Sequence, residues 1–427
     1  MKKTVFLIVM LLLSSLLFLH NAFTELGLPE GAKARLGKGY KTGSSIFSDD
    51  GTRFAVASSI GVWIYDVFTA QEVALLRYHP REFTVLAASP DGNMLASANE
   101  NVISLWDIHT GRRIARFSEH SENIRSLVFS PDGEVLASAS EDNTIRLWNT
   151  TTGRLLFLPL SGHVGDVISI AFSPDSKMLA SGSRDNSIRL WSVTTGQHLV
   201  TLEEQIAWGV VTHEGHTGDV TAIAFSPDGA TLASGGTDNK IRLWDVGARE
   251  HRAAISAHSE RVTALAFSPD STILASGSTD NTIRLWNPAT RRLLDTLKKY
   301  ESDIVTLAFS VDGTTLVSGH TGYLSQSWDG RTGEHLSRYI LGSAVYGNSV
   351  RAVAFSPHGI MLASGHGYTG SEHYTDQTGG SCPGFFWYRG KTYTYFRGSV
   401  SLWNILTNVR RSTLRSDLYS YLRVFHK

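Results

Sequence analysis

The chain has 427 residues, of which 42% are hydrophobic and 18% charged, a composition typical of a packed globular protein that excludes an intrinsically disordered one. Its 39 Lys and Arg residues balance its 39 Asp and Glu residues, so it lacks the overall basic field that non-specific nucleic-acid binding requires. A single cysteine, Cys382, excludes an internal disulfide, so packing alone must hold the fold.

The first 22 residues differ from the rest of the chain. Two lysines precede an apolar run from Val5 to Leu19 that only two serines interrupt. A basic start and about 15 apolar residues are typical of a secretory signal peptide, and the run is short for a membrane span of about 20 residues. Ala22 is the nearest cleavage point, but His20 stands where a small residue is expected. A cleaved signal (1–22) and an uncleaved signal anchor therefore both stay open, and either predicts an extracytoplasmic body.

From residue 43 to 415 the chain repeats with a period of about 42 residues. Four consecutive copies are nearly identical: FSPDGEVLASASEDNTIRLWN from Phe129, FSPDSKMLASGSRDNSIRLWS from Phe172, FSPDGATLASGGTDNKIRLWD from Phe225 and FSPDSTILASGSTDNTIRLWN from Phe267. With the looser copies, an aromatic residue ends the third strand of eight units, at Tyr65, Trp106, Trp148, Trp191, Trp244, Trp286, Trp328 and Trp403.

Each unit has the pattern of four short strands separated by turns. The third unit, for example, runs IRSLVFS, EVLASAS, TIRLWN and TTGRLLFLPL, with PDG and EDN between the first three. A small sheet of this kind cannot bury both faces alone, whereas sheets stacked around an axis bury one another. We therefore predict an all-β propeller of eight blades, with seven blades as the alternative.

These repeats resemble the Trp-Asp (WD) repeat β-propeller family, in an extracytoplasmic bacterial form, although Asp follows the aromatic residue in only some units. The resemblance implies a buried hydrogen-bonded network of His, Ser, Asp and Trp in each regular unit. Carried over position by position, the four sets are His120, Ser138, Asp142 and Trp148; His163, Ser181, Asp185 and Trp191; His216, Ser234, Asp238 and Trp244; and His258, Ser276, Asp280 and Trp286.

A hydrolase triad is the alternative interpretation of His, Ser and Asp. Catalytic sets occur once, at one pocket, whereas this combination recurs in four units, so we expect structural bracing and no catalytic residues. In the seventh unit the histidine register holds Tyr300 and the turn Asp is missing, which we attribute to the drift of terminal repeats. The arginine two residues before each Trp is expected to form ion pairs on the strand surface: Arg146, Arg189, Arg242 and Arg284.

Two insertions interrupt the repeat and are the candidate partner-binding sites. One is the Gly-rich and aromatic segment 366–397 in the last unit, and the other surrounds Trp208. Clusters of Tyr and Trp are typical of binding surfaces, although these side chains could equally pack against their own ring. The candidates are Trp208, Tyr368, Tyr374, Phe385, Phe386, Trp387, Tyr388, Tyr393 and Tyr395. The potential ligands in the larger insertion match no zinc spacing, so no metal and no cofactor is expected.

Two segments compete for the fourth strand of the last unit: Lys33–Gly39, within a linker at 23–42, and Asn408–Ser416. We expect the N-terminal segment to close the ring and 416–427 to form a tail. The predicted function is a monomeric, non-enzymatic scaffold that binds a protein or peptide on its insertion-bearing face. A propeller that binds a small ligand or glycan through the aromatic insertion is the alternative. Nucleic acid is not an expected partner. Contact with a membrane is expected only through the N-terminal segment, if that segment stays uncleaved.

Overall fold

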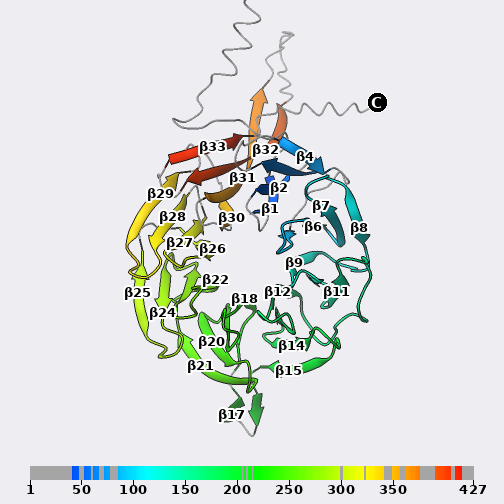
Figure 1. Ribbon diagram of the computed structural model, residues 1–427. Coiled ribbons are helices and arrows are strands. Elements are labelled where there is room, and N and C mark those ends of the chain that lie inside the picture. The colour runs from blue at the N-terminus through cyan, green and yellow to red at the C-terminus, as the bar shows by residue number, and fades with distance from the viewer. Residues whose placement is uncertain are drawn as a thin grey trace, which may run out of the picture.

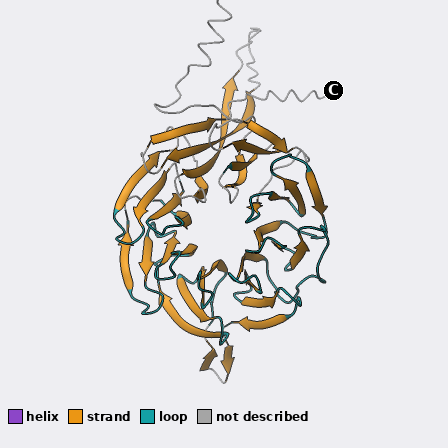
Figure 2. Cartoon of the chain, viewed as in Figure 1, coloured by secondary structure: helices purple, strands orange, loops and turns teal. Residues whose placement is uncertain are grey.

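The computed structural model describes most of the repeat region. The described residues are 41–47, 52–58, 61–66, 72–76, 85–203, 205–207, 210–213, 215–298, 302–321, 324–340, 349–355, 361–375, 390–404 and 409–415. In this part of the chain every regular element is a strand and no helix occurs, as Figure 2 shows. The predicted all-β class is confirmed. The proposed signal or anchor segment at 1–22 and the tail at 416–427 lie outside the described residues.

The strands form antiparallel sheets in which neighbours in the chain are neighbours in space. The first four sheets follow the first four sequence units. Sheet 1 contains β1 (Lys41–Phe47), β2 (Arg53–Ser58), β3 (Gly61–Asp66) and β4 (Glu72–Leu76). Sheet 2 contains β5 (Val85–Ala88), β6 (Met94–Asn99), β7 (Val102–Asp107) and β8 (Arg113–Phe117). Sheet 3 contains β9 (Ile124–Phe129), β10 (Val135–Ser140) and β11 (Ile145–Asn149), and sheet 4 contains β12 (Val167–Phe172), β13 (Met178–Ser183), β14 (Ile188–Ser192) and β15 (His198–Leu202).

The remaining sheets follow the last four units, after a separate hairpin of β16 (Gln205–Ala207) and β17 (Val210–His213). Sheet 5 contains β18 (Val220–Phe225), β19 (Thr231–Gly236), β20 (Lys240–Asp245) and β21 (Glu250–Ser256). Sheet 6 contains β22 (Val262–Phe267), β23 (Leu274–Ser278), β24 (Ile283–Trp286) and β25 (Leu293–Leu297). Sheet 7 contains β26 (Ile304–Phe309), β27 (Thr315–His320), β28 (Leu324–Asp329) and β29 (His335–Ile340), and sheet 8 contains β30 (Ser349–Phe355), β31 (Met361–Thr375), β32 (Gly390–Asn404) and β33 (Val409–Arg415).

The sheets stand around a common axis, with the first strand of each nearest the axis and the last strand outermost (Figure 1). The first strand of each sheet contacts the first strand of the next, and β1 contacts both β5 and β30. The circle is therefore complete, which confirms the predicted propeller architecture.

The expectation that the N-terminal segment supplies the outer strand of the last sheet is wrong. The position beside β32 is occupied by β33, which pairs with it from Ser399↔Arg415 to Asn404↔Val409. A short connection between neighbouring strands costs less loop-closure entropy than a pairing of the two chain ends, so the local segment wins. The ring closes instead by packing of sheet 1 on sheet 8, and β1 begins at Lys41, two residues before the predicted start of the repeats.

The third unit lacks the predicted fourth strand. In place of a ladder, residues 153–160 form two isolated bridges to β11, Ile145↔Leu160 and Trp148↔Leu155. Pro159 has no backbone N–H to donate, and its ring restricts the preceding residue, so pairing cannot continue through it. The segment still covers the sheet, but it bulges outward and leaves the Leu158 side chain 86% exposed.

The hydrophobic core lies between the sheets. Phe117 of sheet 2 stacks on Trp148 of sheet 3 with ring centroids 4.4 Å apart. Leu243 of sheet 5 and Trp286 of sheet 6 belong to one buried cluster, and an equivalent cluster joins each neighbouring pair of sheets from sheet 1 to sheet 7. Burial of one such side chain contributes about 1.5–3 kcal/mol, and in these clusters residues of the next sheet take part in burying it.

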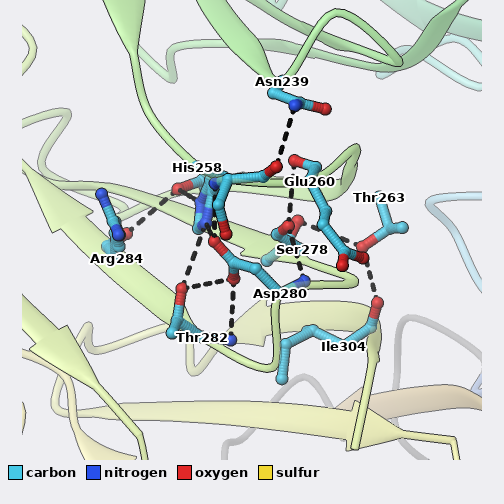
Figure 3. Close-up of polar contacts among 12 residues, drawn as sticks. Asn239, His258, Glu260, Thr263, Ser278, Asp280, Thr282, Arg284 and Ile304 are labelled. Atoms are coloured by element: carbon cyan, nitrogen blue, oxygen red, sulfur yellow. Dashed lines mark hydrogen bonds and ion pairs between the residues drawn. The ribbon is translucent and has the colours of Figure 1, made fainter.

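Small residues set how closely the sheets approach. A Cβ atom on Gly235 would lie 2.5 Å from Val262 Cγ1 of the next sheet, so only glycine permits this spacing. At the same level the hydroxyl of Thr263 donates a hydrogen bond of 2.6 Å to the backbone oxygen of Ile304, across the following interface (Figure 3). Close apolar contact and a direct polar bond therefore fix neighbouring sheets to each other.

Candidate functional site

The four predicted His–Ser–Asp–Trp sets are each brought together as one hydrogen-bonded chain. In sheet 6, Trp286 Nε1 donates to Ser276 Oγ at 2.9 Å, and Ser276 Oγ lies 2.8 Å from His258 Nε2. His258 Nδ1 lies 2.9 Å from Asp280 Oδ2 (Figure 3). Because the serine oxygen accepts from the indole, its own proton is directed to Nε2, and the imidazole proton sits on Nδ1 and is donated to the carboxylate.

The other three sets have the same geometry. His Nδ1 lies 2.7 Å from the carboxylate in the His120–Asp142 pair, 2.8 Å in the His163–Asp185 pair and 3.0 Å in the His216–Asp238 pair. His Nε2 lies 2.8 Å from the serine oxygen in all three sets, at Ser138, Ser181 and Ser234. The indole nitrogen lies 3.0 Å from that oxygen for Trp148 and 2.9 Å for Trp191 and Trp244. Each hydrogen-bonded set connects four parts of one sheet: the loop before the first strand, the second strand, the turn before the third strand and the third strand itself.

Burial favours a neutral imidazole in sheets 5 and 6, and hydrogen bonding favours ionised carboxylates in all four networks. Burial lowers the pKa of His216 and of His258 below the ordinary value. Burial alone would raise the pKa of Asp142, but hydrogen bonds from His120 and Thr144 outweigh it and hold that pKa below its usual range. The same balance lowers the pKa of the other three network carboxyls, Asp185, Asp238 and Asp280.

The arrangement differs from a catalytic triad at the serine. The four network serine residues are 0% exposed, so no substrate atom can approach their oxygens: Ser138, Ser181, Ser234 and Ser276. A nucleophilic serine must also have a free lone pair directed at the substrate. In these sets the serine oxygen instead accepts a hydrogen bond from the indole N–H. The sets can hold loops and strands together but cannot attack a ligand.

Sheet 5 departs from the other three sets at its carboxylate. Lys240 replaces the hydroxyl residue that elsewhere donates to the Asp side chain, namely Thr144, Ser187 or Thr282. Arg242 takes over this bond, with Nη1 2.7 Å from Asp238 Oδ2, and is 2% exposed. The expectation of ion pairing on the strand surface is therefore wrong for Arg242, because its ion pair with Asp238 is buried and supplies the side-chain donor that the missing hydroxyl provides in the other sets.

Sheet 7 contains a network residue that the sequence analysis missed. Trp328 Nε1 donates to Ser318 Oγ at 3.1 Å, and Ser318 Oγ lies 2.8 Å from Nε2 of His320, which comes from the same strand. Ser302 Oγ lies 3.2 Å from the other ring nitrogen. Sheet 7 therefore also has an imidazole beside its network serine, but this imidazole belongs to β27 and not to the loop before the first strand. It has no carboxylate partner within the described residues. The only available signal was a histidine two residues after the network serine.

The insertions lie at opposite edges of the ring (Figure 1). In the last sheet, β31 and β32 pair over 15 residues each, up to Thr375↔Gly390, and include Tyr368, Tyr374, Tyr393 and Tyr395. The second hairpin, β16–β17, projects from the far side. The predicted residues Trp208, Phe385, Phe386, Trp387 and Tyr388 lie outside the described residues. One compact partner surface built from both insertions finds no support in this arrangement.

Two features of the described residues concern metals and membranes. Among the described residues, no three His, Cys, Asp or Glu side chains are close enough to hold a metal ion. Those residues also include no helix that is long and apolar enough to cross a membrane.

Comparisons with known proteins agree with this fold. A family model described as the TEP-1 second beta-propeller matches residues 133–343, and the model described as WD domain, G-beta repeat, matches residues 71–107, 111–149 and 341–371. A crystal structure of the computationally designed Ika8 protein is similar over 78% of this chain and 95% of its own, with 27% identity and a TM-score of 0.66.

Curated relatives match over single repeats. The small ribosomal subunit protein RACK1 of Schizosaccharomyces pombe is 46% identical over 46 residues, which is 11% of this chain and 15% of that protein. A U3 snoRNP-associated protein-like YAOH of Oryza sativa is 59% identical over 39 residues, 9% of this chain and 8% of that protein. The human WD repeat and FYVE domain-containing protein 2 is 38% identical over 55 residues, 13% of this chain and 14% of that protein. The match thus spans about 15% or less of these proteins.

The bracing role of the networks predicts a specific loss of stability. In Ser138→Ala, the indole of Trp148 loses its acceptor and His120 Nε2 loses its donor, both in a buried site, so we expect the free energy of unfolding to fall by about 2 kcal/mol. Ser121→Ala is the matched control, since Ser121 is exposed and uses only its backbone N–H to bond Asp142. Urea unfolding of both variants measures the difference, and equal stabilities would contradict the bracing role.

The relocated histidine of sheet 7 predicts acid sensitivity. Burial lowers the pKa of His320 from 6.5 to about 4. Between these pH values the unfolded chain binds a proton that the folded chain does not, so the free energy of unfolding falls by up to about 3 kcal/mol as the pH drops through this window.

His320→Asn should remove this component. In sheet 2, Ser97 Oγ accepts from Trp106 Nε1 at 2.8 Å and a buried Asn99 follows two residues later, so the fold accepts asparagine at this position. Urea unfolding at pH 7, 6, 5 and 4 should show the stability of the native protein falling more steeply than that of the variant. Parallel pH profiles would rule out His320 as the source.

Proposed function

Since the chain belongs to the WD-repeat β-propeller family, we propose that it is a non-enzymatic scaffold that binds a protein or peptide partner outside the cytoplasm, with its eight sheets as eight blades. The observation that carries the proposal is the burial of the His–Ser–Asp sets. These are the repeated groups with catalytic potential, and they are used to brace the ring, which leaves its surfaces and insertions for recognition.

The hairpin of the last sheet supports a docking role. The second and third strands of the described sheets 1–7 have four to six residues each, whereas β31 and β32 have 15. The two strands stay in register for eight pairs beyond Gly367↔Gly398, as far as Thr375↔Gly390. An extension that the ring does not need for closure, and that is rich in aromatic residues in sequence, supports recognition of a partner.

The extracytoplasmic setting rests on the N-terminal sequence. The basic start and the apolar run from Val5 to Leu19 are typical of an export signal. A chain with a single cysteine has no structural disulfide to form, so a fold held by packing alone is compatible with an oxidising compartment.

A hairpin exchange tests the docking role. Gly367 and Gly398 are direct partners, so residues 368–397 can be replaced by Asn-Gly, which forms a two-residue hairpin turn. We expect this variant to keep its thermal unfolding midpoint within a few degrees, because the ring contacts of sheet 8 are retained, and to lose the proteins that the intact chain captures from an extracytoplasmic fraction.

Replacement of the β16–β17 hairpin by the same turn is the matched control and should leave capture unchanged. Identical captured proteins for all three chains would contradict docking at the long hairpin. Loss of binding to a glycan array, with protein capture unchanged, would favour the small-ligand alternative.

A further inference from the structure

The turn between the third and outer strands has a left-handed residue that contacts the preceding sheet. In four sheets this residue is glycine, with φ between 66° and 71°: Gly111, Gly153, Gly196 and Gly333. A Cβ atom on Gly153 would lie 3.1 Å from Ala115 of the preceding outer strand, and one on Gly111 would lie 3.2 Å from Ala74. The turn therefore lies against the rim of the neighbouring sheet, where glycine suits both the backbone and the space.

Sheets 5 and 6 have arginine at this position. Arg249 has φ 60° and Arg291 has φ 62°. Their backbone N–H groups make the same turn bond as the glycines do, to the oxygens of Asp245 and Asn287 at 2.8 and 2.7 Å. A non-glycine residue in this region is strained, and arginine lacks the short polar side chain that eases the strain in Asn and Asp. Two adjacent sheets thus keep an exposed arginine where glycine would fit better.

The two strained arginines and four other residues of the outer turns and strands of sheets 5 and 6 are together called the basic rim: Arg249, Arg252, Arg291, Arg292, Leu293 and Leu294. All six side chains are exposed. Leu293 and Leu294 are 46% and 51% exposed and begin β25, in which every residue except Leu297 is exposed. No other outer strand of the described sheets 1–6 is as open as β25.

The basic rim has the charge and shape for an extended acidic segment. Glu250 and Asp295 are the carboxylates interspersed with its four arginines, so its net charge is positive although the whole chain is neutral. Both β21 and β25 are the last strands of their sheets, so each has one unpaired backbone edge. The rim is convex (Figure 1), so a planar membrane would touch one outer strand at a time, whereas an extended chain can follow two. The leucine pair requires apolar groups, which a phosphate backbone does not offer.

We propose that the basic rim of sheets 5 and 6 binds an extended segment of a protein partner in which carboxylates alternate with apolar residues. The carboxylates pair with the arginines and the apolar side chains cover the leucine pair. This site is separate from the hairpin of sheet 8, so it can fail while docking at the hairpin holds, and the reverse.

The double variant Arg249→Gly/Arg291→Gly tests the proposal without damage to the fold, because glycine is the residue that sheets 2, 3, 4 and 7 use in this turn. The probe is a fluorescent dodecapeptide with six Asp or Glu and three Leu residues, and its affinity is measured by anisotropy at low and physiological salt. We expect the double variant to bind at least tenfold more weakly than the native chain, with an unfolding midpoint that is not lowered. Leu294→Ser should also weaken binding.

Arg154→Ala is the matched control, since Arg154 is an exposed arginine on the rim of sheet 3, outside the basic rim. It should bind the probe as the native chain does. An affinity that is the same for native chain and double variant, or no binding of the probe at all, would overturn the proposal. Arginine-dependent binding to single-stranded DNA or to anionic vesicles, in place of the peptide, would overturn the assignment of a protein partner.

Discussion

The structure depends on the mutual burial of neighbouring sheets. No helix in the described residues covers the apolar clusters between sheets 1 and 7, so the cover for each of these sheets comes from the next sheet. The contact of β1 with β30 then matters as much as any local pairing, because an open row would expose the outer face of its first and last members. Gly235 shows this requirement for close packing at a single position, because a larger residue there would collide with Val262 of the next sheet.

The polar networks follow from this close packing. Once the sheets are pressed together, the loops and turns at the edge of the core carry polar atoms that water cannot reach, and each needs a partner. Four sheets solve the problem with the same four side chains. Sheet 5 uses Arg242 where a hydroxyl is missing, and sheet 7 brings His320 from a strand. Different residues that meet one requirement indicate a structural need, which is why repetition of His, Ser and Asp predicts bracing and not chemistry.

The sequence predicted those features that the residues of one repeat unit determine. It did not predict features that depend on contacts formed only in the folded protein. The strands and turns follow from the repeat, because identical local patterns fold identically, and the four networks follow from the resemblance of these repeats to the WD family. The lost strand beside Pro159 was readable in principle, since proline cannot donate to a ladder. The role of His320 was not, because its partners Ser302 and Ser318 are brought together only by the folded sheet. The outer strand of the last sheet was a choice between two candidate segments that differ in loop entropy, which their residue patterns do not reveal.

Distances between equivalent turn positions test the closed circle most directly. Six exposed positions each lie four residues after the Trp of a third strand: Thr110, Thr152, Thr195, Ala248, Thr290 and Thr332. Each can be changed to cysteine and spin-labelled in a Cys382→Ser chain. Measured from Thr110 by electron paramagnetic resonance, a closed ring of eight predicts that the distance rises to a maximum at Thr290 and falls again at Thr332, where it equals that at Ala248. A distance that keeps increasing to Thr332 would contradict the account.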